Sequence, residues 1–82
     1  MPDNITFIAN GNSLSVARSD VEQAMRGVVP EPLRSLVVDV GGTLYPVKQV
    51  FEAVTGMDRL DFTSATARRH LSKLGFAVSR TS

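Results

Sequence analysis

Apolar residues recur with two spacings along the chain, and the shorter spacing predicts strands near the N-terminus. The segments "ITFIA" (5–9) and "SLSVA" (13–17) carry β-branched and other strand-forming residues. Asn10 and Gly11 lie between them, and this dipeptide favours a two-residue hairpin turn because both residues tolerate positive φ. We therefore expect a first β-hairpin. The alternative is that residues 10–13 form a plain loop leading to the first helix.

A second hairpin is predicted in the middle of the chain, after a corner that contains two prolines. The corner, "VVPEPL" (28–33), cannot form regular helix because proline lacks the backbone N–H that a helix needs. The strand-like segments "SLVVDV" (35–40) and "TLYPV" (43–47) then flank Gly41 and Gly42. Because glycine adopts positive φ without strain, this pair gives the stronger of the two hairpin signals.

The longer spacing is that of amphipathic helices, and the first such segment follows the N-terminal strands. Ser19 and Glu22 have the spacing of a capping box, in which each side chain binds a backbone N–H of the first turn. Gly27 marks the expected end of this helix. Its apolar residues share one face, and they are Val21, Ala24 and Met25.

The second helix has the most regular apolar pattern in the chain. Its inward residues fall at i, i+3, i+4 and i+7, and they are Val47, Val50, Phe51 and Val54. Pro46 ends the preceding strand and suits a first helical turn, where its missing N–H costs nothing. Gly56 marks the end. The polar residues expected to point away from the core are Lys48, Gln49 and Glu52.

The third helix follows a loop, residues 57–62, that Leu60 and Phe62 are expected to anchor. Thr63 or Ser64 caps this helix and Gly75 ends it. Its buried stripe consists of Ala67, Leu71 and Leu74. The segment "FAVSR" (76–80) then closes the fold as a short strand, whose inward residues are Phe76 and Val78.

These elements predict one α+β domain over residues 1–82, with a small, mostly antiparallel sheet and two or three helices packed on one face. A chain of 82 residues with 43% hydrophobic and 21% charged residues is typical of a globular domain with one modest core. Without cysteine there is no disulfide or thiolate metal site to consider. The sequence contains no leader pattern and no run of eighteen apolar residues, so we expect a cytoplasmic protein with no membrane partner.

The net charge of +1 favours no particular partner, but its distribution is uneven. Residues 1–41 carry three basic against five acidic side chains, whereas residues 42–82 carry six basic against three acidic. Any basic surface must therefore be built mainly by the second half. The third helix contributes Arg68, Arg69 and Lys73, which form either a phosphate-binding face or a solvated one. Lys48 and Arg59 could extend this face only if the fold brings the beginnings of the last two helices together.

Catalytic groups are scarce in this sequence. The single histidine, His70, follows two arginines and has no neighbouring carboxylate to orient it, so we expect a surface or boundary residue. Asp58 and Asp61 lack the alternating ligands of a calcium loop, and no serine lies in G-x-S-x-G. Lys48 falls a whole strand beyond the double glycine, which excludes a phosphate-binding P-loop. We therefore expect no catalytic residue, no metal and no cofactor.

The order of "VEQAM", "VVDVGGTLYPVKQVFEAVTG" and "DFTSATARRHLSKLGFAV" resembles the small N-terminal head domain of McrA-like modification-dependent HNH endonucleases and related short standalone actinobacterial-type proteins. The resemblance covers residues 21–78, and its most specific part is "YPVK" (45–48) at its distance from "LSKLGF" (71–76). The family often has a lysine where this chain has Gly42-Thr43, and a double glycine where it has Ser64-Ala65. The HNH part has no counterpart in these 82 residues. The resemblance therefore implies a restriction-associated accessory module, with DNA contact but no endonuclease activity.

The corner at residues 45–48 completes the functional hypothesis. Pro46 fixes the backbone where strand becomes helix, so Tyr45 and Lys48 are expected to project from a rigid corner. Tyrosine can stack on a base, and lysine adds to the positive end of a helix dipole; alternatively, Tyr45 packs in the core with its hydroxyl at the rim.

We therefore expect a non-enzymatic nucleic-acid-binding or DNA-associated regulatory module, with DNA as the first choice of ligand. Its binding residues are predicted to be Tyr45, Lys48, Arg68, Arg69 and Lys73. The alternative is a protein-interaction adaptor that docks a larger, DNA-processing partner through an apolar surface or a sheet edge.

Overall fold

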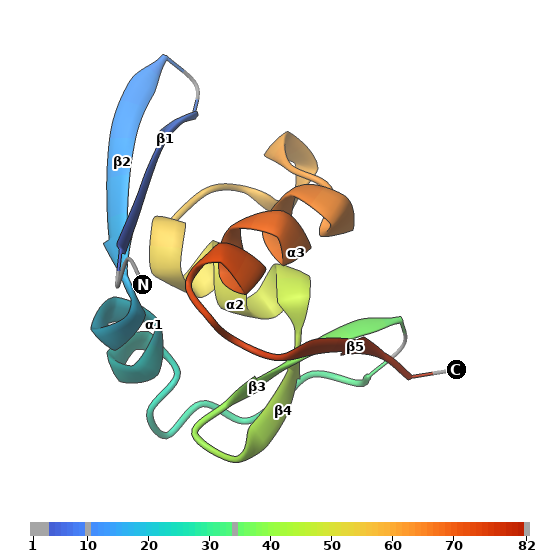
Figure 1. Ribbon diagram of the computed structural model, residues 1–82. Coiled ribbons are helices and arrows are strands. Elements are labelled where there is room, and N and C mark those ends of the chain that lie inside the picture. The colour runs from blue at the N-terminus through green and yellow to red at the C-terminus, as the bar shows by residue number, and fades with distance from the viewer. Residues whose placement is uncertain (1–3, 10, 34, 82) are drawn as a thin grey trace.

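Antiparallel strand pairs and helices alternate along the chain in the computed structural model, which describes residues 4–9, 11–33 and 35–81 (Figure 1). Strands β1 (Asn4–Ala9) and β2 (Asn12–Ala17) form a two-stranded sheet. Strands β3 (Leu36–Val40), β4 (Thr43–Pro46) and β5 (Val78–Arg80) form a second sheet in the order β4-β3-β5. The helices are α1 (Arg18–Ala24), α2 (Val47–Thr55) and α3 (Ser64–Lys73), with a 3₁₀ turn η1 (Arg59–Asp61). The α+β class is confirmed.

Among the described residues the strands divide between two sheets, and the first hairpin pairs with no strand of the second sheet. Helices α2 and α3 pack against each other and lie between this hairpin and the three-stranded sheet (Figure 1). Phe7 of β1 contacts Phe51 of α2 and His70 of α3, which fixes the hairpin against the helices. One hydrophobic cluster runs from Val16 in β2 to Phe76 before β5.

Both predicted hairpins are confirmed. Gly41 and Gly42 adopt φ of 62° and 88°, and β3 pairs with β4 in the register Val40↔Thr43. Positive φ at both central residues is the geometry of a type I′ turn, which matches the natural twist of the flanking strands. The first hairpin pairs Ala9 with Asn12, and Gly11 has φ 78°; Asn10 lies outside the described residues.

Helix α1 begins earlier than the predicted capping box, so that prediction is wrong. Its N-cap residue is Ala17, and the Asp20 carboxylate accepts the Ala17 backbone N–H at 2.8 Å. Because the helix follows β2 without a loop, the third helical position falls on Asp20 and not on Glu22. Glu22 instead forms an ion pair with Arg18 at 3.8 Å. The inward residues Val21 and Met25 are buried as expected.

Helix α2 has the predicted bounds and the predicted apolar face. Val47, Val50 and Phe51 are buried, Val54 packs against the core, and Gly56 ends the helix with φ 74°. Gln49 is buried too, and its prediction as an outward residue is wrong. Its amide accepts the Glu31 N–H at 2.9 Å and donates to the Val29 carbonyl at 3.0 Å. The proline corner thus covers Gln49, donating one hydrogen bond to its side-chain amide and accepting one from it.

The loop before α3 has one anchor and not two. Phe62 is buried against Phe51, with ring centroids 4.8 Å apart, whereas Leu60 is 93% exposed. The prediction for Leu60 is wrong because residues 59–61 form a 3₁₀ turn, capped by the Asp58 carboxylate, that turns Leu60 outward. Thr63 caps α3 by accepting the Thr66 N–H at 3.2 Å.

The rest of the C-terminal prediction is confirmed. The stripe of α3 is buried, Gly75 follows the helix with φ 92°, and Phe76 points into the core. Within the described ranges of the chain, no helix is long and apolar enough to cross a bilayer.

Candidate nucleic-acid interface

The expected functional corner divides into a core residue and a surface residue. Tyr45 is only 4% exposed, and its hydroxyl donates to the carbonyl oxygens of Met25 and Val28, each at 3.1 Å. Strand β4 alternates Leu44 outward with Tyr45 inward, which aims the ring at the turn after α1. The expectation that Tyr45 stacks on a base is therefore wrong, because the ring is buried and the hydroxyl already donates to two backbone carbonyls.

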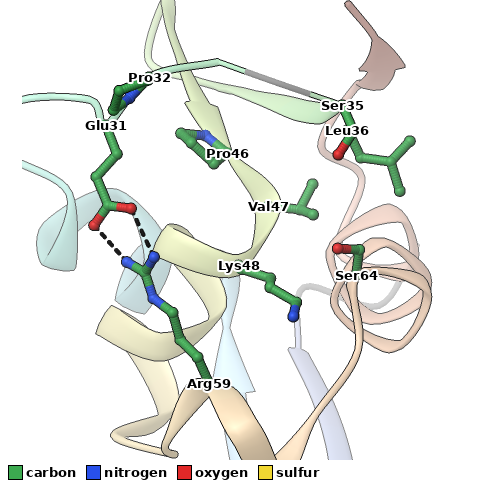
Figure 2. A pocket seen from close by; sticks show the side chains of 9 residues that line it. All are labelled: Glu31, Pro32, Ser35, Leu36, Pro46, Val47, Lys48, Arg59 and Ser64. Atoms are coloured by element: carbon green, nitrogen blue, oxygen red, sulfur yellow. Dashed lines mark hydrogen bonds and ion pairs between the residues drawn. The ribbon is translucent and has the colours of Figure 1, made fainter.

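Lys48 lies in the first turn of α2 and is half-buried. It lines an open depression of about 320 Å³ together with Pro46, Val47 and Ser64, the last of which begins α3. In Figure 2, Lys48 runs between the Glu31–Arg59 pair on one side and Ser64 on the other. The fold therefore does bring the beginnings of α2 and α3 to one site.

Arg59 lines the same depression but is neutralised by two carboxylates. Its guanidinium binds Glu31 through two hydrogen bonds and Glu52 through a third at 3.0 Å (Figure 2 draws the Glu31 pair). The hydrogen bond from Arg59 holds the pKa of Glu31 below its ordinary value, and the same bond raises the pKa of Arg59. Glu31 and Arg59 therefore both stay charged at neutral pH, and Arg59 adds no free positive charge next to Lys48.

The three cations of α3 are exposed. Within the described residues, Arg68, Arg69 and Lys73 form no ion pair or hydrogen bond, in contrast to Arg18 and Arg59. Helical spacing places Arg68 one turn beyond Ser64, on the side of the Lys48 depression. Arg69 and Lys73 lie one turn apart on the side of His70.

His70 is buried, and its prediction as a surface or boundary residue is wrong. The imidazole stacks on Phe7 at a centroid distance of 4.3 Å and lies parallel to Phe51 at 5.6 Å. Burial lowers the pKa of His70, and the positive charges of Arg69 and Lys73 lower it further. The ring is therefore neutral at pH 7, and the positive charge on this side of α3 belongs to Arg69 and Lys73.

Sequence reasoning missed a second candidate surface, where β1 and η1 approach α3. A depression of about 220 Å³ there is lined by Phe7, Asp61, Phe62, Arg69 and His70, among others. Residues 57–70 supply most of this lining, and long-range packing adds Phe7 and Phe51 to them, which no local pattern predicted. In the described part of the chain, no three His, Cys, Asp or Glu side chains gather as a candidate metal site.

The family model described as SCO5918-like matches residues 7–82 of this chain. The match begins inside β1 and includes all later helices and strands through β5. No curated protein and no solved structure matches the chain.

Proposed function

Because that match spans nearly the whole fold, the chain belongs to the SCO5918-like family, and we propose that it is a non-enzymatic nucleic-acid-binding module with DNA as the first candidate ligand. Its binding surface is the exposed face of α3, extended at the start of the helix by Lys48. Such a module acts in the cytoplasm, either alone or beside a larger DNA-processing protein. Tyr45 has no part in this proposal.

The observation that carries the proposal is the unpaired charge on α3. Arg68, Arg69 and Lys73 lie within two helical turns, and the described residues offer none of them an acidic partner. Two arginines elsewhere form ion pairs, Arg18 with Glu22 and Arg59 with Glu31 and Glu52. Arg26 and Arg80 have no ion pair among the described residues, but each is a single charge, whereas α3 carries three. Exposed, unpaired cations are what phosphate groups require, and each phosphate contact releases condensed counterions from the nucleic acid.

Lys48 extends this surface at one end. It lies beside Ser64, and Arg68 follows Ser64 by one turn on the same helix. A lysine in the first turn adds its charge to the partial positive charge of the α2 N-terminus. A nucleic-acid backbone that follows α3 from Lys73 to Arg68 would therefore reach Lys48 next.

The resemblance of residues 21–78 to the head domain of McrA-like endonucleases supports the same proposal. The family comparison does not link the chain to those enzymes, so this kinship is itself proposed. It suggests an accessory, restriction-associated role in which the module contacts DNA and another protein performs the chemistry.

The test is a binding titration with duplex DNA, single-stranded DNA and RNA over a series of salt concentrations. Arg68→Ala, Arg69→Ala and Lys73→Ala should each weaken binding to all sequences alike. Each should also flatten the slope of log affinity against log salt by about 0.7 to 0.9, the value for one lost phosphate contact. Arg26→Ala is the matched control, because it removes one exposed positive charge from the turn after α1.

Wild-type binding must exceed that of an unrelated small domain of equal charge. If the protein binds none of the three nucleic acids more tightly at low salt than that domain does, the face of α3 is merely solvated and the proposal fails.

A second candidate, a protein-interaction adaptor, is favoured by exposed apolar side chains. Leu60, in η1, is 93% exposed, and Val29, in the connection between α1 and β3, is 82% exposed. In the described residues, β4 and β5 each pair only with β3, so each leaves one edge open to a partner strand. For an adaptor, Leu60→Ser should weaken capture of a protein partner, whereas Arg69→Ala should leave capture unchanged.

A further inference from the structure

The depression between β1, η1 and α3 combines an aromatic wall with two opposite charges. Its aromatic lining consists of Phe7, Phe51, Phe62 and His70. The depression has a volume of about 220 Å³ and is open to solvent, so it can accept one flat ring system. The hairpin supplies one side of this site, where β1 lies beside the helices (Figure 1).

The rings of the wall hold one another in place. Phe7 stacks on His70, and Phe51 contacts both of these rings and also Phe62. Phe51, Phe62 and His70 are at most 9% exposed, so the floor of the site is rigid and apolar. Phe7 is partly exposed and is the most accessible of the four rings. A flat, polarisable ring is the group that such a wall accepts best.

The rim carries Asp61 and Arg69, and neither side chain has a partner among the described residues. They line the same depression without forming an ion pair with each other. The backbone N–H of Asp61 donates to the Asp58 carbonyl at 2.9 Å, so the 3₁₀ turn fixes the backbone position from which the Asp61 carboxylate extends. A ligand that offers donors on one edge and acceptors on another would satisfy both groups at once.

We propose that this depression binds a single unpaired guanine base, so that the module prefers guanine-containing single-stranded nucleic acid. The proposal rests on the proposed function, because Arg68 and Lys73 would still hold phosphates. It reassigns Arg69 from a phosphate to the base, so Arg69→Ala should remove the guanine preference and should not weaken all sequences alike. It adds a base preference that phosphate contacts alone cannot give.

Guanine fits the rim better than the other bases do. Its N1–H and exocyclic amino group are two adjacent donors for the Asp61 carboxylate, while O6 and N7 accept from a guanidinium such as Arg69. Adenine would turn the lone pair of N1 toward the carboxylate. The pyrimidines cover less of the aromatic wall. The base must be unpaired because a duplex hides its Watson–Crick edge.

The first experiment compares heptamers by fluorescence anisotropy with the full chain. One heptamer carries a single central guanine among thymines, and the others carry adenine, thymine or inosine at that position. We expect the guanine heptamer to bind at least roughly five-fold more tightly than the thymine and adenine heptamers, the low end of the discrimination from one bidentate contact. Inosine, which lacks the exocyclic amino group, should lose most of this advantage.

The second experiment separates base recognition from charge. Asp61→Asn removes a negative charge, so phosphate attraction alone predicts tighter binding of every heptamer. Base recognition instead predicts that the guanine preference disappears, because the amide presents a donor where guanine needs an acceptor. Glu22→Gln is the matched control: it makes the same charge change on α1, outside this depression, and should keep the preference. The Asp61 side chain has no partner in the described structure, so this variant should fold.

Each outcome decides the proposal. If no heptamer binds but duplex DNA does, the guanine site is overturned and the phosphate-binding module stands. If neither binds, and RNA does not bind either, the proposed function fails together with this inference. If all heptamers bind equally, the phosphate-binding module stands and the guanine site is overturned. The same holds if Asp61→Asn keeps the preference, or if amide NMR shifts on binding the guanine heptamer spare Phe7 and Asp61. If an acidic peptide with a tryptophan shifts those amides and no heptamer does, the depression belongs to a protein partner and the inference is wrong.

Discussion

Replacing Tyr45 by phenylalanine should weaken the fold without weakening ligand binding. The change removes one oxygen atom and leaves the ring in place, so it opens no large cavity. In the wild type the hydroxyl donates to the carbonyls of Met25 and Val28, both at 3.1 Å. It joins β4 to the turn after α1 across 20 and 17 residues of sequence.

The magnitude follows from what the two carbonyls lose. A typical hydrogen bond contributes about 0.5 to 1.5 kcal/mol net, and a buried acceptor left without its donor adds a desolvation penalty of about 1 to 3 kcal/mol. The single hydroxyl proton is shared between both acceptors, so we expect a total loss of about 1 to 2 kcal/mol. For 82 residues the free energy of unfolding is about 4 to 12 kcal/mol, so the loss is a substantial fraction. The melting temperature should fall by about 4 to 16 °C.

Urea denaturation followed by far-ultraviolet circular dichroism measures this loss. Tyrosine fluorescence cannot be used, because Tyr45 is the only tyrosine and the chain has no tryptophan. Leu44→Ala is the control on the neighbouring, outward position of β4 and should change the free energy by less than about 0.5 kcal/mol. An unchanged stability for Tyr45→Phe, or a native stability with lost nucleic-acid binding, would refute the structural role assigned to this hydroxyl.

Three further predictions concern the core, the turn and pH. Phe51→Ala should cost about 3 to 5 kcal/mol, because Phe51 is 3% exposed and contacts three other rings; a loss below about 1 kcal/mol in denaturant titrations would contradict its place in the core. Replacing Gly41 and Gly42 together by valine should cost about 2 kcal/mol or more through backbone strain, whereas Thr43→Val should not; equal melting temperatures for both variants would contradict the turn geometry. His70 has a pKa below its ordinary 6.5, so the unfolded chain takes up this proton first. Stability should therefore fall as the pH drops below about 6.5, by at most about 1.4 kcal/mol per unit, and His70→Phe should lessen that slope; the same slope in both proteins would contradict the burial of a neutral ring.

Local sequence patterns determined the elements that depend on neighbours in the chain. The double glycine at 41–42 specified a hairpin because only its backbone adopts positive φ at both positions without strain. The spacing of apolar residues specified α2 and its buried face. Thr63 marked the start of α3 because its side chain caps the first turn, and Gly75 marked the end because glycine adopts positive φ without strain. The exposure of the three α3 cations follows from the same periodicity.

Tertiary structure decided the fate of side chains whose partners lie far away in sequence. Tyr45 became a core residue because the turn after α1, 17 to 20 residues earlier, supplies two carbonyls. Gln49 was buried by the proline corner, which lies 18 to 20 residues before it, and Arg59 was neutralised chiefly by Glu31, 28 residues before it. Periodicity assigns a residue to a face, but it does not say which segment covers that face.

The candidate sites show the same division. The amino-acid pattern located the positive charge on the last helix and placed Lys48 in the first turn of the helix before it. Only the fold placed Lys48 beside the start of α3, and only the fold brought Phe7 from the first strand to His70, 63 positions later. Local hydrogen bonds and steric limits act over a few residues and can be read from the sequence, whereas a surface depends on which distant segments the core packs together.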